Sequence, residues 1–197
     1  PNFKVIRGNE IYLCRNGLNG QNFNKEVDKY YHFILLAKDE IGNEQIRELS
    51  TRAWMQSFTE RRIRRVPTYY QDLYEVISKN PGHVIGSTAC IGSALGQQLL
   101  KFKESQDMTL YEKIKNWCLT LQGLFGKENF FLEMQPSFDK EQVYVNKKII
   151  ELSEELNIPF VLDYHHYLCN HDIKNLETYL PRILKTWSHT NLPPKMH

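Results

Sequence analysis

Short apolar runs alternate with longer amphipathic stretches along this chain of 197 residues. The runs have the length of β-strands, and the stretches between them show the periodicity of α-helices. This alternation is typical of βα units built around a parallel sheet. We therefore predict an α/β fold, either an open sheet or a barrel.

The expected elements follow one another without a linker, a repeat or a low-complexity tract. Strands are predicted at residues 3–7, 10–14, 31–37, 83–90 and 129–134, with a last strand that starts at 158 and ends in Asp163. Helices are predicted at residues 43–57, 69–79, 94–103, 109–124, 138–156 and 173–187. Residues 193–197 can begin one more strand. The run 31–37 is apolar throughout, as in a strand buried on both faces, and Thr109 with Glu112 resembles a helix capping box.

Composition excludes several classes of protein. The formal charge of +2 neither requires nor excludes nucleic acid. The four cysteines lie far apart with no Cys-x-x-Cys pair, which argues against a zinc ribbon or a disulfide scaffold and favours a reduced, cytoplasmic setting. No apolar run approaches the roughly 18 residues of a membrane span, so no membrane partner is expected. The chain begins at Pro1 within a strand-like segment and looks cut from something longer.

The last predicted strand ends in an acid and two imidazoles, Asp163, His165 and His166. A carboxylate oxygen and an imidazole nitrogen suit a divalent metal, whereas the alternative is a His-rich surface turn. Strand alternation places Asp163 and His165 on one face. A turn after Asp163 would reverse that choice and favour His166.

Further candidate ligands lie in or beside other predicted strands: Glu10, His32, Cys90 and Glu133. Each also has a structural interpretation. Glu10 can be a solvated acid and His32 a hydrogen-bonded core histidine. Cys90 can be a small buried hydrophobe, and Glu133 is an acid inside an aromatic strand. Lys195 and His197 alternate at the chain end and can face one pocket, or they can be frayed. No Gly-x-Ser-x-Gly elbow or phosphate-binding glycine motif is present, so metal-activated water is the most economical chemistry.

A basic segment, expected to be a loop, is the feature most typical of nucleic-acid binding. It contains Arg61, Arg62, Arg64 and Arg65, and Tyr69 follows. Arginines contact phosphates and tyrosines stack on bases. The alternative is a solvated loop, or one that forms salt bridges with Glu60 and Asp72.

Four of these stretches together, 4–12, 31–38, 86–92 and 131–135, resemble the polymerase-and-histidinol-phosphatase (PHP) domain of bacterial and phage DNA polymerase III alpha subunits. The resemblance covers residues 3 to about 160. It implies a distorted, TIM-like (βα) barrel that binds divalent metals, with Glu10, His32 and Cys90 as ligands. The family's opening His-x-His strand and the Asp-His turn after it are absent, so the barrel is expected to be incomplete.

Residues 158–197 instead resemble the C-terminal part of the UV damage endonucleases, which are also metal-dependent barrels. That resemblance implies site roles for Asp163, His166, Lys195 and His197, with Glu133 as a possible acid. The chain therefore looks composite: one barrel-like domain over 1–197, with a polymerase-like portion at 1–160 and an endonuclease-like portion at 161–197.

The predicted function is divalent-metal-dependent hydrolysis of phosphodiesters in DNA, of the proofreading type associated with a replicative polymerase. Zinc or manganese is the expected ion. DNA is the expected partner, together with other domains or subunits of a polymerase. Two alternatives stay open: a UV damage endonuclease, and a catalytically silent structural module of a polymerase.

Overall fold

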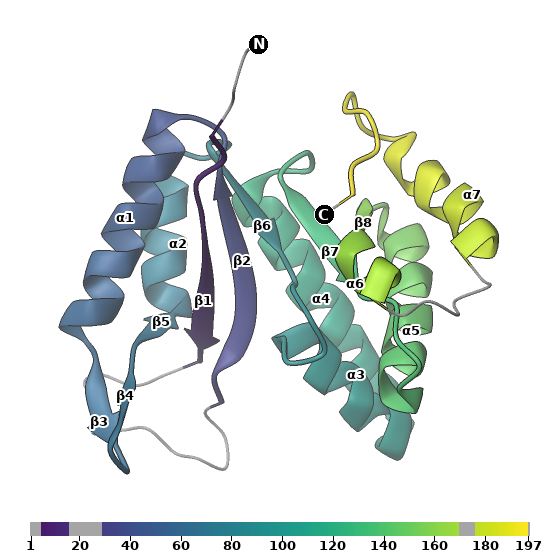
Figure 1. Ribbon diagram of the computed structural model, residues 1–197, viewed down its shortest axis with the longest axis horizontal. Helices are drawn as coiled ribbons and strands as arrows, with labels where there is room; N and C mark the ends of the chain where they lie inside the picture. The colour runs from purple at the N-terminus through teal and green to yellow at the C-terminus, as the bar shows by residue number, and fades with distance from the viewer. Residues whose placement is uncertain (1–4, 16–28, 170–175, 197) are drawn as a thin grey trace. The chain divides into compact units, whose positions relative to one another are not determined.

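A computed structural model describes residues 5–15, 29–169 and 176–196 of the chain (Figure 1). The chain divides into two compact units, unit 1 (Pro1–Gly86) and unit 2 (Ser87–His197). Strands and helices alternate in both units, which confirms the predicted α/β class. The prediction of one domain divided near residue 160 stays a prediction. None of the described helices has both the length and the apolar character needed to cross a membrane.

The sheet of unit 1 is mixed. Strand β1 (Gly8–Cys14) pairs antiparallel with β2 (Tyr31–Ala37) and parallel with β5 (Pro67–Tyr69). Strand β6 (Val84–Ser87) is the neighbour of β2 on its other side, so the strand order is β5-β1-β2-β6. Within unit 1 this sheet is open, in keeping with the predicted incomplete barrel.

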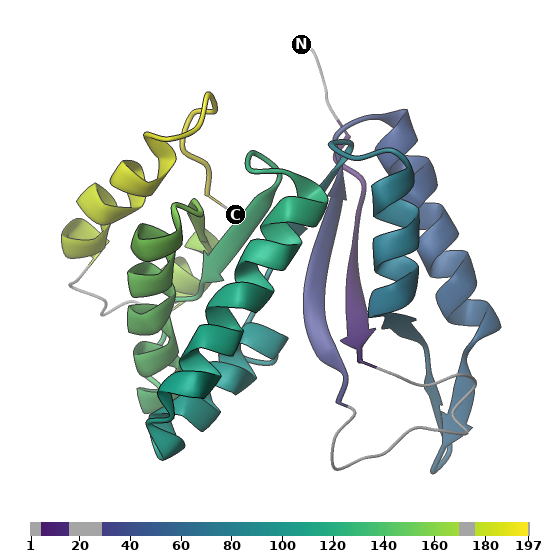
Figure 2. The same cartoon turned by 180° about the vertical axis from the view of Figure 1, so that it is seen from behind.

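Two helices, α1 (Glu40–Met55) and α2 (Tyr70–Lys79), lie on one side of β1 and β2 (Figure 2). Phe33 and Leu35 point to that side and are buried, whereas His32 and Ile34 between them are half-buried. The prediction that residues 31–37 are buried on both faces is therefore wrong. The strand alternates because the helices cover one face of it.

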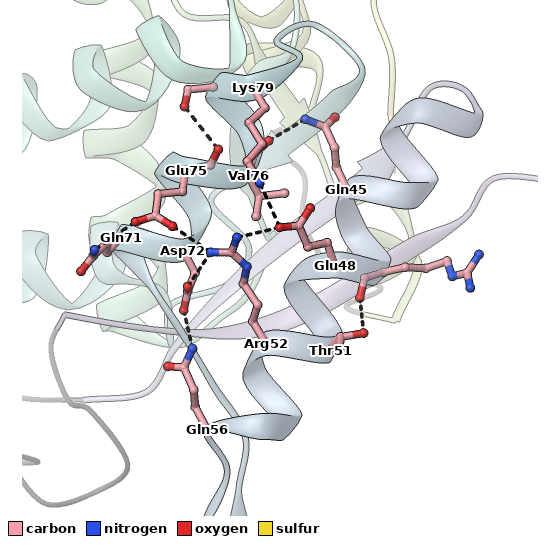
Figure 3. A network of polar contacts seen from close by, with 12 residues as sticks. Gln45, Glu48, Thr51, Arg52, Gln56, Gln71, Asp72, Glu75, Val76 and Lys79 are labelled. Carbon is pink, nitrogen blue, oxygen red and sulfur yellow. Dashed lines mark hydrogen bonds and ion pairs between the residues drawn. The ribbon is translucent and has the colours of Figure 1, made fainter.

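The two helices of unit 1 are joined by charged side chains (Figure 3). Arg52 of α1 donates to Asp72 at 3.0 Å and to Glu75 at 2.9 Å, both on α2. The same guanidinium donates to Glu48, one turn earlier on α1. Gln45 adds a buried hydrogen bond to the carbonyl of Val76 at 2.9 Å. These bonds fix α1 against α2 beneath the sheet.

The basic segment forms a hairpin rather than the predicted loop. Strand β3 (Phe58–Glu60) pairs antiparallel with β4 (Ile63–Arg65), in a two-stranded sheet of its own. Arg61 and Arg62 form the turn, and both have positive φ angles, 46° and 72°. No glycine or asparagine in the segment signals such a turn, which is why the sequence suggested a loop.

Unit 2 alternates helices with two parallel strands. Its elements are α3 (Ala94–Ser105), α4 (Met108–Phe125), β7 (Phe130–Met134), α5 (Lys140–Leu156), β8 (Phe160–Leu162), α6 (Tyr164–Cys169) and α7 (Leu176–Trp187). The register of β7 and β8 pairs Leu132 with Phe160 and Met134 with Leu162. At the start of α4 the N-cap is Asp107, which accepts from the N–H of Thr109. The predicted capping box at Thr109 is therefore wrong, because the helix begins one residue earlier.

Aromatic side chains hold strand β8 in place. Trp187 of α7 donates its indole N–H to the carbonyl of Phe160 at 2.9 Å, and its ring stacks on Phe131 of β7 with centroids 5.1 Å apart. Phe125 stacks on Phe130, with ring centroids 6.2 Å apart. All four aromatic rings are buried. Strands β7 and β8 therefore end on a rigid support, which positions the polar residues that follow them.

Candidate functional site

The polar cluster of unit 2 lies where β7 and β8 end. Asp163 follows β8 directly, and its own N–H donates to the carbonyl of Met134 at 2.9 Å. Its carboxylate oxygen Oδ1 accepts the backbone N–H of His166 at 2.9 Å. This is the hydrogen bond of a helix N-cap, and α6 starts at the next residue. Because the chain turns into a helix here, His166 and not His165 returns to Asp163.

The imidazole of His166 is oriented by the same carboxylate. Nδ1 of His166 lies 2.6 Å from Oδ2 of Asp163. A carboxylate accepts hydrogen bonds, so Nδ1 carries the proton and, in the neutral ring, Nε2 carries the lone pair. Asp163 is 7% exposed and His166 is 48% exposed. A buried acid thus presents an accessible imidazole in a single tautomer, which is the arrangement found behind many metal-binding histidines.

A second carboxylate, Glu133, lies on the adjacent strand β7 and is 2% exposed. Its Oε2 accepts from the hydroxyl of Ser87 at 2.9 Å, and its Oε1 accepts from Nε2 of Gln135 at 3.3 Å. The same Gln135 amide lies 3.4 Å from Oδ2 of Asp163. Gln135 therefore links the two carboxylates. Each oxygen of the buried Glu133 carboxyl group thus has a hydrogen-bond donor, as buried polar groups require.

The chain end returns to the same edge. Met196 forms an isolated parallel bridge with Leu162, where the sequence suggested one more strand. Lys195 precedes Met196 and so lies next to this bridge in the sequence. Lys195 is exposed. His197, the other predicted member of that pair, lies outside the described residues.

Two further predicted ligands of unit 2, His165 and Cys90, have hydrogen-bond partners nearby in the sequence. Nε2 of His165 is 3.7 Å from the thiol of Cys169, one turn further along α6. Cys90 follows β6 in a tight turn, where its sulfur accepts the N–H of Gly92 at 3.3 Å. The predicted strand 83–90 is shorter in the structure, because β6 ends at Ser87 and Ala89 adopts a φ of 56°.

In unit 1 the predicted ligands Glu10 and His32 form a pair. Tyr12 lies opposite His32, and Glu10 is two residues before Tyr12 on the same strand. Alternate residues of a strand share a face, so Glu10 and His32 lie on the same face of the antiparallel pair. Oε1 of Glu10 lies 2.8 Å from Nδ1 of His32. The ring of His32 packs edge-on against Tyr12, with centroids 5.3 Å apart.

The potential metal donors of unit 1 and of unit 2 each form a carboxylate–imidazole pair. Glu10–His32 offers one carboxylate and one imidazole, and Asp163–His166 offers another such pair. Within the described ranges, no group of three or more His, Cys, Asp or Glu side chains is placed to hold one ion. Structural and catalytic zinc sites use at least three protein ligands. The donor types fit zinc or manganese, but each described pair would need a further ligand.

The predicted nucleic-acid residues divide into two groups. Arg61, Arg62 and Arg64 are exposed on the β3–β4 hairpin, and Arg65 is half-buried. Tyr69 is 6% exposed in β5, so its ring is not available at the surface for stacking on a base. The tyrosine was suggested by its neighbourhood in the sequence. Its burial follows from the parallel pairing of β5 with β1.

Three site residues were not anticipated: Gln135, Ser87 and Thr88. Gln135 was detectable, because it follows Glu133 by two positions, the spacing at which side chains share a face of an extended chain. Thr88 accepts the backbone N–H of Glu133 at 3.0 Å. Ser87 and Thr88 carry no signal of their own in the sequence, since hydroxyl residues at a strand end are common in turns.

Comparison with known proteins agrees with the two resemblances found in the sequence. Residues 2–137 match the family model of the PHP domain, and residues 130–197 match that of the UV-endonuclease UvdE. The first match spans more than half of the chain, so the chain belongs to the PHP domain family. Both families are metal-dependent in general. Membership in the first implies a TIM-like barrel.

Individual relatives repeat this division. The chain is 39% identical over 178 residues to the Probable DNA polymerase YorL of Bacillus subtilis (strain 168), covering 84% of this chain and 13% of that protein. It is 29% identical over 174 residues to the DNA polymerase III subunit alpha of Borreliella burgdorferi, covering 86% and 13%. A shorter match, 44% over 57 residues, joins it to a UV DNA damage endonuclease of Bacillus cereus (strain G9842), covering 29% and 18%. The chain spans less than a fifth of the length of each.

Proposed function

We propose that this chain hydrolyses phosphodiester bonds in DNA with the help of a divalent metal ion, in the manner of a polymerase-associated proofreading activity. One observation carries the proposal: buried Asp163 holds the exposed imidazole of His166 in one tautomer, beside a second buried carboxylate at the end of the adjacent strand. Membership in the PHP domain family supports the reaction type. DNA as substrate is transferred from the names of the relatives, which are polymerases and endonucleases.

The residues of the cluster take separate roles. His166 is the metal-binding or proton-accepting group, through Nε2. Asp163 orients that ring through Nδ1, so that Nε2 faces away from the carboxylate, and the amide of Gln135 links Asp163 to Glu133. Lys195, which is exposed and precedes Met196, is the cation proposed to attract a phosphate oxygen. His197 follows Met196 in the sequence and stays a predicted ligand.

The pair Glu10 and His32 is a second place for an ion, and Cys90 stays a predicted ligand with it. When bound, a divalent ion such as zinc or manganese supplies an activated water and neutralises charge on phosphate oxygens. The protein's own contribution is to hold donors of the right kind in fixed positions. Partnership with other domains or subunits of a replicative polymerase, and a cytoplasmic location, are part of the same proposal.

The test measures product and metal together. The 197-residue chain, loaded with zinc or manganese, is incubated with a primer–template whose 3′ nucleotide is mismatched. Release of mononucleotides from the 3′ end is expected, and His166→Gln is expected to reduce it by at least about a hundredfold. Arg47→Gln, an exposed residue of α1, serves as the control and is expected to retain the rate. Equal rates in the chain and in His166→Gln would refute the assignment of this site.

A second candidate function is nicking of DNA beside a UV lesion. It is favoured because Glu133, Asp163, His166 and Lys195 all lie within the segment 130–197 that matches the UV-endonuclease UvdE. The discriminating substrate is an irradiated closed-circular duplex, on which this function gives a nicked circle and proofreading gives none. A chain that retains less than about a tenth of an equivalent of metal after purification, and cleaves neither substrate, would instead be a silent structural module.

A further inference from the structure

We infer that the tip of the β3–β4 hairpin, Arg61 and Arg62, binds phosphates of the DNA backbone and takes no part in the hydrolysis itself. The inference rests on DNA being the substrate, as proposed above, and names the surface that holds it. Both views show the hairpin extending beyond the end of α1 within unit 1 (Figure 1, Figure 2). The segment from Phe58 to Arg65 contains four arginines and one acid, Glu60.

Two of the four arginines anchor the hairpin instead of extending from it. The guanidinium of Arg64 donates to the hydroxyl of Ser57, at 3.0 Å from Nε. Arg65 donates to Glu60 across the hairpin at 3.2 Å, and its guanidinium lies over the ring of Tyr30 at 5.0 Å from the centroid. The single acid of the segment is thereby paired. These contacts use the two arginines of β4 for structure.

The two arginines of the turn differ in both contacts and backbone. Arg61 and Arg62 are exposed, and among the described residues neither makes an ion pair or a side-chain hydrogen bond. Their φ angles of 46° and 72° lie in the left-handed region, as in the two-residue turns that favour Asn-Gly or Gly-Gly. A residue with a side chain is strained there. Two bulky cations thus stand where stability alone would favour glycine.

The chemistry of the tip selects its ligand. Two adjacent guanidinium groups match the oxygens of successive phosphates, each through paired N–H donors. Ile63 beside them is 54% exposed and offers apolar contact to a sugar. Tyr69, the predicted stacking residue, is buried, and the described tip residues 61–63 include no aromatic side chain. The tip therefore fits the DNA backbone without regard to sequence, the mode in which phosphate contacts dominate affinity.

The decisive variant is Arg61→Gly/Arg62→Gly, because glycine removes both charges and relieves the backbone strain. Binding to a labelled duplex of about 20 base pairs is measured by fluorescence anisotropy in EDTA, between about 50 and 200 mM salt. The dissociation constant is expected to rise about tenfold or more, and the salt slope to fall by about 2. The melting temperature is expected to stay the same or rise by a few degrees.

Two controls complete the experiment. Arg47→Gln/Lys113→Gln removes two exposed positive charges elsewhere and is expected to change the dissociation constant less than about twofold. Arg61→Lys/Arg62→Lys keeps the charges and is expected to keep the salt slope. The inference is overturned if the glycine variant binds like the Arg47/Lys113 control, or if its melting temperature drops. The binding assay contains EDTA and therefore does not depend on a bound metal ion. A chain that binds DNA through the tip but hydrolyses no substrate contradicts the proposed function and leaves this inference standing.

Discussion

His166 contacts Asp163 twice, through its backbone N–H to Oδ1 at 2.9 Å and through ring Nδ1 to Oδ2 at 2.6 Å. One oxygen starts helix α6 and the other orients the imidazole. The same carboxylate therefore caps the helix and orients the histidine of the candidate site. A substitution at Asp163 can separate them, because capping needs an acceptor while ring orientation with charge balance needs a carboxylate.

Asp163→Asn is expected to keep the helix and lose the site. Asparagine caps helices as well as aspartate does, so the free energy of unfolding should stay within about 0.5 kcal/mol of the parent chain, whereas Asp163→Ala should lose about 1 kcal/mol. Both variants should lose metal retention and hydrolysis. Chemical denaturation and elemental analysis of the purified proteins make the comparison. Full metal content in Asp163→Asn would contradict the role given to the carboxylate.

The strands were more predictable than the site they support. The predicted strand 31–37 matches β2 residue for residue, and the predicted helix 69–79 differs from α2 by one residue, because uninterrupted apolar runs and periodic faces are local signals. The choice of His166 over His165 was not settled by the sequence. It depends on whether the chain stays extended or turns helical after Asp163, and an aspartate with its partner three residues later becomes a cue only once a helix is assumed.

The hairpin shows a different kind of failure. Its two strands are three residues each, too short for alternation to appear, and its turn contains arginines where turns of this type favour glycine or asparagine. Local preference and observed structure disagree at Arg61 and Arg62. Such disagreements concentrate at functional sites, and the binding experiment above tests this one.

Gly42 is expected to tolerate no side chain. It lies in the first turn of α1, and a Cβ added there would stand 2.0 Å from the carbonyl oxygen of His83. Gly42→Ala should lower the free energy of unfolding by about 3 kcal/mol or more, since backbone must move to admit the methyl group. Gly123 in α4 is the matched control. A Cβ at that glycine meets nothing within 4 Å, so Gly123→Ala should gain about 0.5–1 kcal/mol. Thermal denaturation of the two variants measures the contrast, and equal melting temperatures would contradict it.

Arg52 is expected to be the main polar contact between α1 and α2 (Figure 3). Arg52→Met keeps the apolar stem but leaves the carboxylates of Asp72 and Glu75 without their shared cation, and should cost about 1–2 kcal/mol. Lys79 lies at the edge of the same network, where its ammonium group pairs with Glu48 at 3.2 Å. Lys79→Met should cost less than about 0.5 kcal/mol. Urea denaturation gives both values. An equal cost for the two variants would mean that Arg52 is only a surface ion pair.

The pair Arg182–Glu154 in unit 2 predicts a pH dependence of stability. Arg182 donates to both oxygens of Glu154, at 2.8 and 2.7 Å, and these hydrogen bonds lower the pKa of Glu154 from its ordinary value of 4.5. A carboxyl whose pKa is lowered on folding binds more protons in the unfolded chain, so its contribution to stability is complete above 4.5 and is lost as the pH falls through the folded pKa.

The difference in unfolding free energy between the parent chain and Arg182→Met should therefore be constant from about pH 7 to pH 5, and should shrink as the pH falls below 4.5 and through the lowered pKa of Glu154. Urea denaturation at several pH values measures this difference. Arg47→Met is the control, because Arg47 has no carboxylate partner among the described residues and its difference should not depend on pH. A difference for Arg182→Met that persists unchanged at the lowest pH would show that the arginine stabilises α7 through packing of its stem rather than through the carboxylate of Glu154.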